Sequence, residues 1–193
     1  MTLSDEELAL RAQRGSQEAF TMLVDRHQKR MYGLALQMLR HPDDAADAAQ
    51  EAFLRSYAAL HSYDSNYSFG AWLYRIAYNY CLDMLRRRQR TPVVRGTAAS
   101  IEFALDNAVD PGPAVEEIAE QNLSMEAIAE AVNYLPDDAR HILTLRYTSN
   151  LSYGEIAQVL RVPESTVTMR LHHAKRALRA IMNQSNMEPY GPS

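Results

Sequence analysis

Small polar and cationic side chains gather on one side of the segment 165–179, near the C-terminal end of the 193-residue chain. At 100° per residue, this side lies opposite an apolar stripe that consists of Val167, Leu171, Ala174, Leu178 and Ile181. Polar side chains in the first half of such a helix can reach base edges in the major groove of DNA, and cations in its second half can bind phosphates. The pattern therefore predicts recognition of nucleic acid rather than catalysis.

The side chains within about 40° of the direction opposite the stripe are Ser165, Met169, His172 and Arg176. Thr168, His173 and Arg179 flank them. A surface helix whose charges are only solvated would show the same pattern, and the helix by itself leaves that alternative open. A metal site at the two adjacent histidines is disfavoured, because neighbouring residues of a helix point in different directions and no thiol or carboxylate accompanies them.

The residues before this helix predict a second, shorter one. Ser152 and Glu155 have the spacing of a capping box, so a helix is expected to start at Tyr153. Pro163 disfavours helical geometry in the residue before it but suits the first turn of a following helix. Two helices separated by a turn of about three residues have the spacing of a helix-turn-helix, which favours DNA binding over a solvated surface helix.

The charges are segregated along the chain, although the net charge is −4. Ten acidic residues and no lysine or arginine lie between Gly96 and Asp138. From Arg140 to the end, seven cations accompany only three acidic residues. The average charge therefore hides a basic C-terminal module that is suited to DNA.

The fold class predicted for the whole chain is all-α, because apolar residues recur three and four positions apart and no strand-like alternation is present. A helical bundle is expected over residues 1–90, with a capping box at Ser4 and Glu7, a proline start at Pro42 and a last helix at about 69–90. Residues 91–115 have the composition of a flexible acidic linker. Residues 116–193 are expected to form a second, smaller helical domain that contains the helix-turn-helix.

Several classes of protein are disfavoured by what the sequence lacks. No apolar run is long enough to cross a membrane, and the acidic N-terminus is unlike a signal peptide, so a cytoplasmic protein without membrane insertion is expected. Cys81 is the single cysteine and is expected to be packed in a core. No set of catalytic residues, metal ligands or cofactor-binding glycines is evident, so neither an enzyme nor a cofactor is expected.

Three stretches of the chain resemble one protein family. They read DDAADAAQEAFLRSYAAL (43–60), FGAWLYRIAYNYCLDMLRRRQR (69–90) and LPDDARHILTLRYTSNLSYGEIAQVLRVPESTVTMRLHHAKRAL (135–178). In this order they resemble a bacterial RNA polymerase sigma factor of the extracytoplasmic-function (group IV) subfamily, which keeps two globular domains and a linker. The resemblance implies a subunit that binds core RNA polymerase, recognises promoter DNA and helps to open it, and it implies an anti-sigma factor as a further partner.

The resemblance also implies roles for individual residues. The helix that carries Asp47, Gln50 and Glu51 is expected to dock on core polymerase. The minus-ten promoter element is expected to contact Ser65, Asn66, Tyr67, Ser68, Asn79, Arg86 and Arg87. The minus-thirty-five element is expected to contact Arg146, Ser165, Thr166, Thr168, Met169, Arg170, His172, His173 and Arg176. Seven aromatic residues between Tyr63 and Tyr80 could stack on unpaired bases, but most of them share a helical stripe that is expected to be core.

Two features leave questions open at this stage. Many members of the family have glycine where Arg161 stands, so the geometry of the turn is not predicted. Acidic residues at 102, 106 and 110 suggest that the linker imitates RNA in polymerase channels, with a passive tether as the alternative. Other functions compatible with parts of the pattern are a dimeric repressor or activator and, more remotely, a helical hydrolase or metal enzyme.

Overall fold

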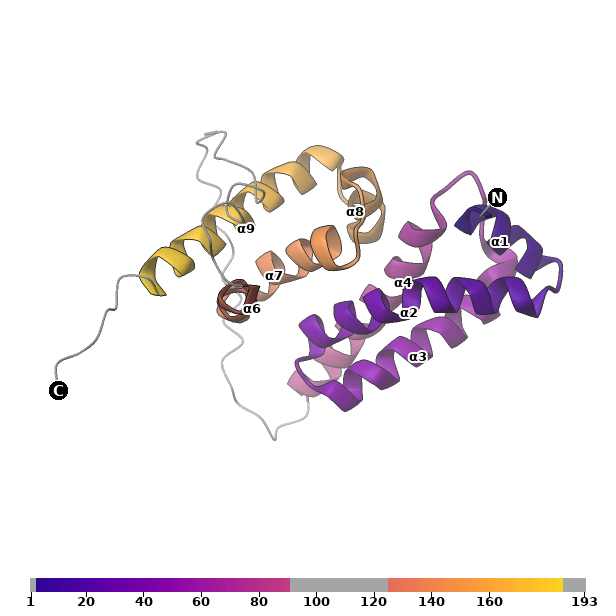
Figure 1. Cartoon of the computed structure of the whole chain (residues 1–193), viewed down its shortest axis with the longest axis horizontal. Helices are drawn as coiled ribbons and strands as arrows, with labels where there is room; N and C mark the ends of the chain where they lie inside the picture. Colours follow the sequence, from indigo (N-terminus) through magenta and orange to yellow (C-terminus); the bar gives the residue numbers. More distant parts are fainter. Residues whose placement is uncertain (1–2, 91–124, 186–193) are drawn as a thin grey trace.

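The computed structural model describes residues 3–90 and 125–185, and every regular element in these two ranges is helical (Figure 1). The first range contains α1 (Asp5–Gln13), α2 (Gln17–Leu39), α3 (Pro42–Ala59), the 3-10 helix η1 (Leu60–Ser62) and α4 (Phe69–Arg90). The second contains α6 (Met125–Asn133), α7 (Asp137–Leu143), the π-helical turn η2 (Thr144–Thr148), α8 (Tyr153–Leu160) and α9 (Glu164–Ser185). The all-α prediction is confirmed. The expected linker at 91–115, including its acidic residues, lies outside the described residues.

Side-chain caps begin the first two helices, and the capping box of the first is the one that the sequence predicts. The Ser4 hydroxyl accepts a hydrogen bond from the Glu7 amide at 3.1 Å, and the Glu7 carboxylate accepts one from the Ser4 amide at 2.8 Å. Gly15 follows α1 with a φ of 97°, a conformation that glycine adopts readily. Ser16 then caps α2 by accepting from the Ala19 amide at 3.2 Å. These local contacts set where each helix begins.

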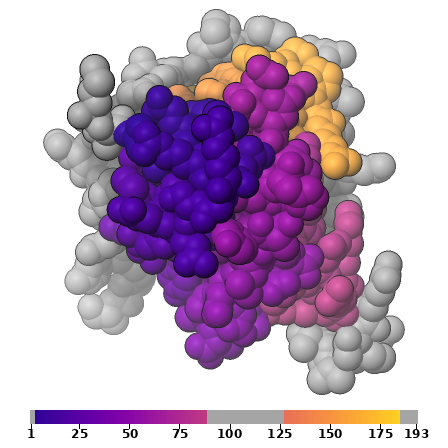
Figure 2. Space-filling view, turned by 90° about the vertical axis from the view of Figure 1, so that its right-hand side faces the viewer, coloured from indigo at the N-terminus to yellow at the C-terminus, as the bar shows by residue number. Residues whose placement is uncertain are grey.

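A charged cluster holds α1 against α2. Asp5 lies 2.7 Å from Nη1 of Arg26 and 2.7 Å from Nε2 of His27, which is buried. The hydrogen bond with His27, aided by Arg26, lowers the pKa of Asp5 to about 2, although burial acts in the opposite direction. In Figure 2, indigo α1 lies beside the magenta segment that leads into α4. Gln13 ties these segments together by donating to the carbonyls of residues 60 and 63, at 2.8 and 2.7 Å.

The aromatic residues around the start of α4 form core, as the helical stripe predicts. Phe69 and Tyr63 are buried, with their ring centres 5.4 Å apart and their planes nearly perpendicular. Trp72 is half-buried against both rings. Cys81 is also buried, and burial raises the pKa of its thiol to about 12. Cys81 is therefore a packing residue rather than a reactive thiol.

In the C-terminal range, the apolar stripe of α9 is confirmed for its first four members, which are all buried. The fifth member, Ile181, is half-buried and packs against the same core, and Met182 beside it is buried. Met182 is the deeper of the two because a step of 3.6 residues from Leu178 falls closer to position 182 than to 181. The π-helical turn η2 was not predicted.

The two helical halves pack against each other. Helix α8 contacts α4, and α2 contacts both α7 and η2 (Figure 1). Leu73 of the first half and Leu151 of the second belong to the same cluster of buried apolar side chains. The sequence predicts two domains but gives no sign that they touch. None of the helices in the described ranges is both long and apolar enough to span a membrane.

Candidate nucleic-acid interface

Helices α8 and α9 form the helix-turn-helix that the spacing predicts. The capping box is present, because the Glu155 carboxylate accepts from the Ser152 amide at 2.7 Å and the Ser152 hydroxyl accepts from the Glu155 amide at 3.3 Å. Pro163 precedes α9 by one residue instead of lying in its first turn, and its carbonyl accepts from the amides of residues 166 and 167. The difference is small, because a helix start shifts by one residue with the definition that is applied.

Arg161 supplies the left-handed residue that ends α8. Its φ of 56° and ψ of 46° are those of a left-handed C-cap, and its amide donates to the carbonyl of Ala157. Glycine adopts this conformation without the steric penalty that a Cβ atom brings. The turn therefore keeps the geometry that a glycine would favour, and the arginine backbone is strained.

The outer face of α9 presents most of the side chains that were expected to contact DNA. Exposed positions are Ser165, Thr168, Met169, Arg170 and Arg176, whereas Thr166, His172 and His173 are half-buried. The hydroxyl of Thr168 donates to the Glu164 carbonyl at 3.2 Å, which leaves its methyl group and its oxygen lone pair at the surface. The exposed set has the small polar and cationic character that the sequence predicts for a groove-binding helix.

Arg146 lies on η2 and is held by the start of α8. Its Nη1 donates to the Leu151 carbonyl at 2.9 Å, and its guanidinium carbon lies 5.5 Å from the centre of the Tyr153 ring. These contacts brace the turn that leads into the helix-turn-helix. Sequence reasoning did not find this bracing role, because both contacts depend on the fold of η2.

The loop before α4 carries the predicted minus-ten candidates and borders a pocket. Ser65, Asn66 and Tyr67 are exposed, and Tyr67 is 58% exposed. Ser68 differs, because it is half-buried and its hydroxyl donates to the carboxylate of Glu155 on α8. The pocket has a volume of about 440 Å³ and is lined by Ser62, Tyr63, Asp64, Tyr67, Ala71, Trp72, Arg75 and Gln158. Aromatic faces beside a cation are suited to an unpaired base.

The remaining minus-ten candidates lie farther along α4. Asn79, Arg86 and Arg87 are exposed, and none of them lines the pocket. Nη1 of Arg86 lies 3.4 Å from the Asp83 carboxylate, an exposed pair one helical turn apart. The loop and its pocket therefore lie at the N-terminal end of α4, and the two arginines lie near its C-terminal end.

The outer face of α3 carries the three residues that were expected to dock on a partner. Asp47 and Gln50 are exposed, whereas Glu51 is half-buried and accepts from Nε of Arg55 at 2.7 Å. The Arg55 guanidinium in turn lies 4.4 Å from the centre of the Tyr80 ring. Glu51 is thus held in place by a chain of contacts that reaches α4.

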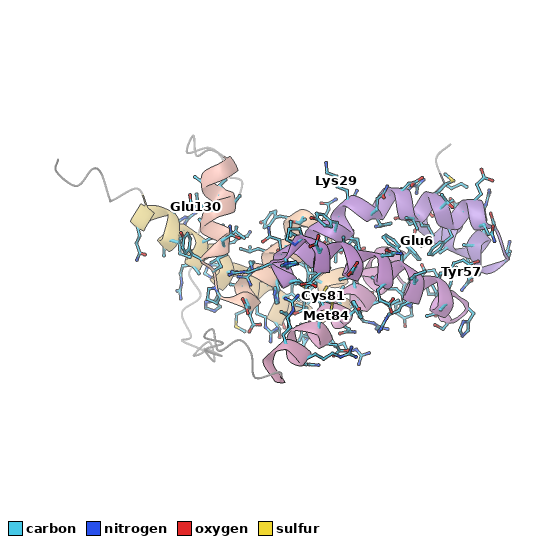
Figure 3. All side chains as sticks on the ribbon, turned by 90° about the horizontal axis from the view of Figure 1, so that it is seen from below. Glu6, Lys29, Tyr57, Cys81, Met84 and Glu130 are labelled. Carbon is cyan, nitrogen blue, oxygen red and sulfur yellow. The ribbon has the colours of Figure 1, made fainter. Side chains whose placement is uncertain are left out.

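An apolar groove between α2 and α3 adjoins this face. It has a volume of about 720 Å³, and the residues that line it are Gln17, Phe20, Thr21, Val24, Gln28, Tyr32, Ala46, Ala49, Gln50, Phe53, Leu54 and Tyr57. Leu54 is 58% exposed and Tyr57 is 49% exposed, and together they give the groove an exposed apolar patch. Figure 3 shows Tyr57 at the end of the molecule opposite Glu130 of α6. Sequence reasoning missed the groove, although Leu54 and Tyr57 stand three residues apart on the polar face.

Within 3–90 and 125–185, no group of three or more histidine, cysteine, aspartate or glutamate side chains is placed to hold a metal ion. His172 and His173 have ring centres 5.9 Å apart and no such group around them. The arrangement offers binding surfaces, and its polar groups are suited to DNA and protein contacts.

Comparison with known proteins decides the family. The chain is 34% identical over 168 residues to the ECF RNA polymerase sigma factor SigW of Bacillus subtilis, which covers 86% of this chain and 90% of SigW. It is 35% identical over 176 residues to the RNA polymerase sigma-H factor of Pseudomonas aeruginosa, with 90% and 91% covered. The chain belongs to the extracytoplasmic-function sigma factors. It is therefore a transcription initiation factor that binds core RNA polymerase and recognises promoter DNA.

Family models and a solved structure place the sigma-factor regions on the helices. The model of Sigma-70 region 2 matches residues 23–91, and the model of Sigma-70 region 4 matches residues 125–178. The fold is similar to that of CnrH in complex with the cytosolic domain of CnrY, with a TM-score of 0.67, 26% identity, and 93% and 97% of the two chains covered. Region 2 thus contains the α3 face, the loop and most of the pocket lining. Region 4 contains the helix-turn-helix, including Gln158 of the pocket.

Proposed function

We propose that this sigma factor divides its work among three surfaces on two functional units, residues 1–90 and 116–193, joined by residues 91–115. The α3 face and its groove bind core polymerase. The loop 65–68, the pocket and the outer side of α4 bind the minus-ten element. The outer face of α9 reads the minus-thirty-five element. The protein acts in the cytoplasm, where polymerase is found, as a binding subunit that catalyses no reaction itself.

Assignment of the α3 face to polymerase rests on its mixed character. A binding surface needs apolar area to exclude water and charged groups to set orientation, and both occur side by side here. The groove supplies exposed Leu54 and Tyr57, and Asp47 and Gln50 lie on the same outer side of α3. Exposed apolar side chains of this size on a monomer commonly mark a contact with another protein.

Assignment of the loop and pocket to the minus-ten element rests on size and chemistry. A DNA base needs a stacking surface, a cation for its phosphate and polar groups at its edge. The pocket provides Tyr67 and Trp72 as aromatic surfaces, Arg75 as the cation and Gln158 as a polar group. Helix α4 continues from the pocket with exposed Asn79, Arg86 and Arg87, which can follow the backbone of the opened strand.

Assignment of α9 to the minus-thirty-five element rests on the exposed set at its N-terminal half. Ser165, Thr168 and Met169 can contact base edges and the methyl group of thymine, and Arg170 and Arg176 can bind phosphates on either side. Half-buried Thr166, His172 and His173 can reach DNA only at the rim of the groove. Arg146 supports α9 indirectly, through its contacts with Leu151 and Tyr153 at the start of α8.

The observation that carries this proposal is the pairing of an exposed apolar groove with an acidic strip on α3, because it assigns the chain to a protein partner as well as to DNA. The decisive experiment is a binding titration with core RNA polymerase. The double variant Asp47→Lys, Glu51→Lys should lose at least about tenfold in affinity, which corresponds to about 1.4 kcal/mol. The matched control is Glu130→Lys, Asp138→Lys, which changes the charge equally at exposed positions outside α2 and α3 and should bind normally.

Equal losses in both double variants would show that only the net charge matters, and undiminished binding in the α3 variant would contradict the docking face. A protein that binds a palindromic DNA without polymerase would instead be a dimeric repressor.

CnrH is described in complex with the cytosolic domain of a second protein, CnrY. By analogy we expect a protein partner of the anti-sigma type to hold this sigma factor inactive.

A further inference from the structure

The C-terminal end of α4, residues 86–90, contains only polar side chains. The apolar stripe of α4 passes through buried Cys81 and half-buried Met84 (Figure 3). At 100° per residue, the position that continues this stripe into the last turn is 88, about 20° from Cys81. An arginine stands there, and its side chain is 42% exposed. Polar contacts of Arg88, rather than burial of an apolar side chain, therefore attach the end of α4 to the rest of the bundle.

Arg88 contacts the ends of two other helices. Its Nη1 donates to the Leu39 carbonyl of α2 at 3.2 Å, and its Nη2 is paired with the Asp44 carboxylate of α3. Leu39 is the last residue of α2, where carbonyls lack an intrahelical partner and attract a cation. Asp44 lies in the first turn of α3, where an acidic side chain is favoured. Figure 1 shows the end of α2, the start of α3 and the end of α4 lying together.

Two acidic residues share the first turn of α3, and they differ in their contacts. Besides Arg88, Asp44 has His41 as a neighbour, with Nδ1 at 3.4 Å from the carboxylate. Asp43 is exposed and takes part in no ion pair within residues 3–90 and 125–185. The two carboxylates therefore carry the same charge at nearly the same place, but only that of Asp44 is tied to α4.

Arg88 and the two candidate DNA cations of this turn point in different directions. At 100° per residue, Arg86 lies about 160° and Arg87 about 100° from Arg88 around the helix. Both are exposed. Holding Arg88 on the inner side of α4 therefore turns the other two outward. A surface that is already fixed loses less conformational freedom on binding than a mobile one, so it binds more tightly.

We propose that Asp44 and Arg88 are positioning residues for minus-ten recognition: the pair fixes the end of α4 so that Arg86 and Arg87 meet the DNA backbone without reordering. This inference rests on the proposed function, since it takes Arg86 and Arg87 as minus-ten contacts. It gives an acidic side chain of α3 a part in DNA binding, although that side chain touches no DNA itself.

The sign of one effect tests the proposal. Loss of an acidic side chain normally strengthens DNA binding, because less negative charge repels the phosphates. Asp44→Asn should instead weaken binding by about threefold, the size expected when one partly exposed ion pair is lost. The assay uses purified holoenzyme, in which every sigma factor carries core polymerase, and the promoter fragment that wild-type holoenzyme selects from a library.

Two control variants accompany this measurement. Asp43→Asn removes the same charge from the same helical turn, and it should bind DNA at least as tightly as the wild type. Asp44→Glu keeps a carboxylate for Arg88 and should restore most of the affinity that Asp44→Asn loses. The salt dependence of binding should be less steep by about one for Asp44→Asn than for Asp43→Asn, because a phosphate contact is weakened.

A double-mutant cycle separates positioning from a general effect on the fold. In the background Arg86→Ala, Arg87→Ala, the further change Asp44→Asn should weaken binding no more, because no cations remain for the pair to position. A pair that only stabilises the bundle would weaken binding by the same factor in both backgrounds, and this result would overturn the proposal.

The remaining outcomes also decide between explanations. Equal affinities of Asp44→Asn and Asp43→Asn would overturn the positioning role, and tighter binding by Asp44→Asn would show that Asp44 withholds Arg88 from DNA. Either result would leave the proposed function intact, provided that Arg86→Ala, Arg87→Ala weakens binding. Undiminished binding by that double variant would instead contradict the proposed function, because these arginines would then make no contact with the minus-ten element.

Discussion

Acidification from about pH 7 to about pH 5 should remove about 2 kcal/mol of folding free energy through one side chain, His141. This residue of α7 is only 4% exposed, and its ring lies edge-on against Tyr78 of α4 with ring centres 6.0 Å apart. Neither ring nitrogen has a hydrogen-bond partner among the described residues. Protonation would therefore place an unsolvated charge between the two helical halves.

The magnitude follows from the pKa. Burial, aided by the charge of Arg140, lowers the pKa of His141 from 6.5 to about 4, against the opposing effect of Asp137 and Asp138. Because the folded-state pKa is the lower one, the unfolded chain binds more protons between these two values, and stability falls as the pH falls through this window. The full loss below about pH 4 is about 3 kcal/mol, of which about 2 kcal/mol is reached at about pH 5. Asp5, with a pKa of about 2, adds its own loss only at lower pH.

The assay is urea unfolding of the wild type and His141→Leu at about pH 7, 6 and 5. The leucine variant loses the ring contact with Tyr78 at every pH, but it should lack the extra loss between pH 7 and pH 5 because it has no group to protonate there. Nuclear magnetic resonance titration of the His141 ring in the folded wild type should give a pKa near 4. Parallel pH dependences for the two proteins, or a ring that titrates near 6.5, would refute the reasoning.

The remaining predictions concern three arginines and the recognition helix. Arg161→Gly should raise the free energy of unfolding by about 1 kcal/mol, because glycine removes the left-handed strain. The control Arg176→Gly, in the middle of α9, should lower it by a similar amount. A lower melting temperature for Arg161→Gly than for the wild type would contradict this. Arg140→Met should lower the free energy of unfolding by about 3 kcal/mol, because the carbonyls of Gln37 and Leu135 lose their donor. The control Arg170→Met, at an exposed position, should change it little. Equal stabilities of the two variants in urea would contradict a stabilising role for Arg140. Substitution of Thr168 or Met169 should change the preferred upstream bases in a promoter-library selection, whereas Arg176→Ala should weaken all sequences and lower the salt slope by about one; uniform losses for all variants would contradict this division.

The helices could be predicted because their sequence signals are local. The capping boxes at Ser4 and Ser152 and the start of α3 at Pro42 act within a few residues, so they can be seen in the sequence and were confirmed. The apolar period of α9 was equally visible, up to half-buried Ile181 at its end. The family was also visible, because three stretches in the right order resemble sigma factors and the comparisons confirm it.

Single residues were harder to assign where a side chain serves two purposes. Trp72 follows the core stripe of α4, yet the structure also gives it a face in the pocket. Arg146 carries the charge expected of a DNA contact, yet its Nη1 donates to the Leu151 carbonyl within the protein. Residue type and helical phase are the same in both cases, so the sequence could not separate the roles.

The sequence by itself determined which segments are helical, where most of them begin, and that the chain is a sigma factor, because caps, periods and motifs depend on neighbours within one or two helical turns. Only the tertiary structure decided how these helices meet. The burial of Arg140 against a carbonyl 103 positions away, the contact of Ser68 with Glu155, and the close approach of Gly33 to Thr148 join residues that no local pattern connects. Their energies come from desolvation and packing in three dimensions, and these are set by which surfaces face each other after the helices have formed.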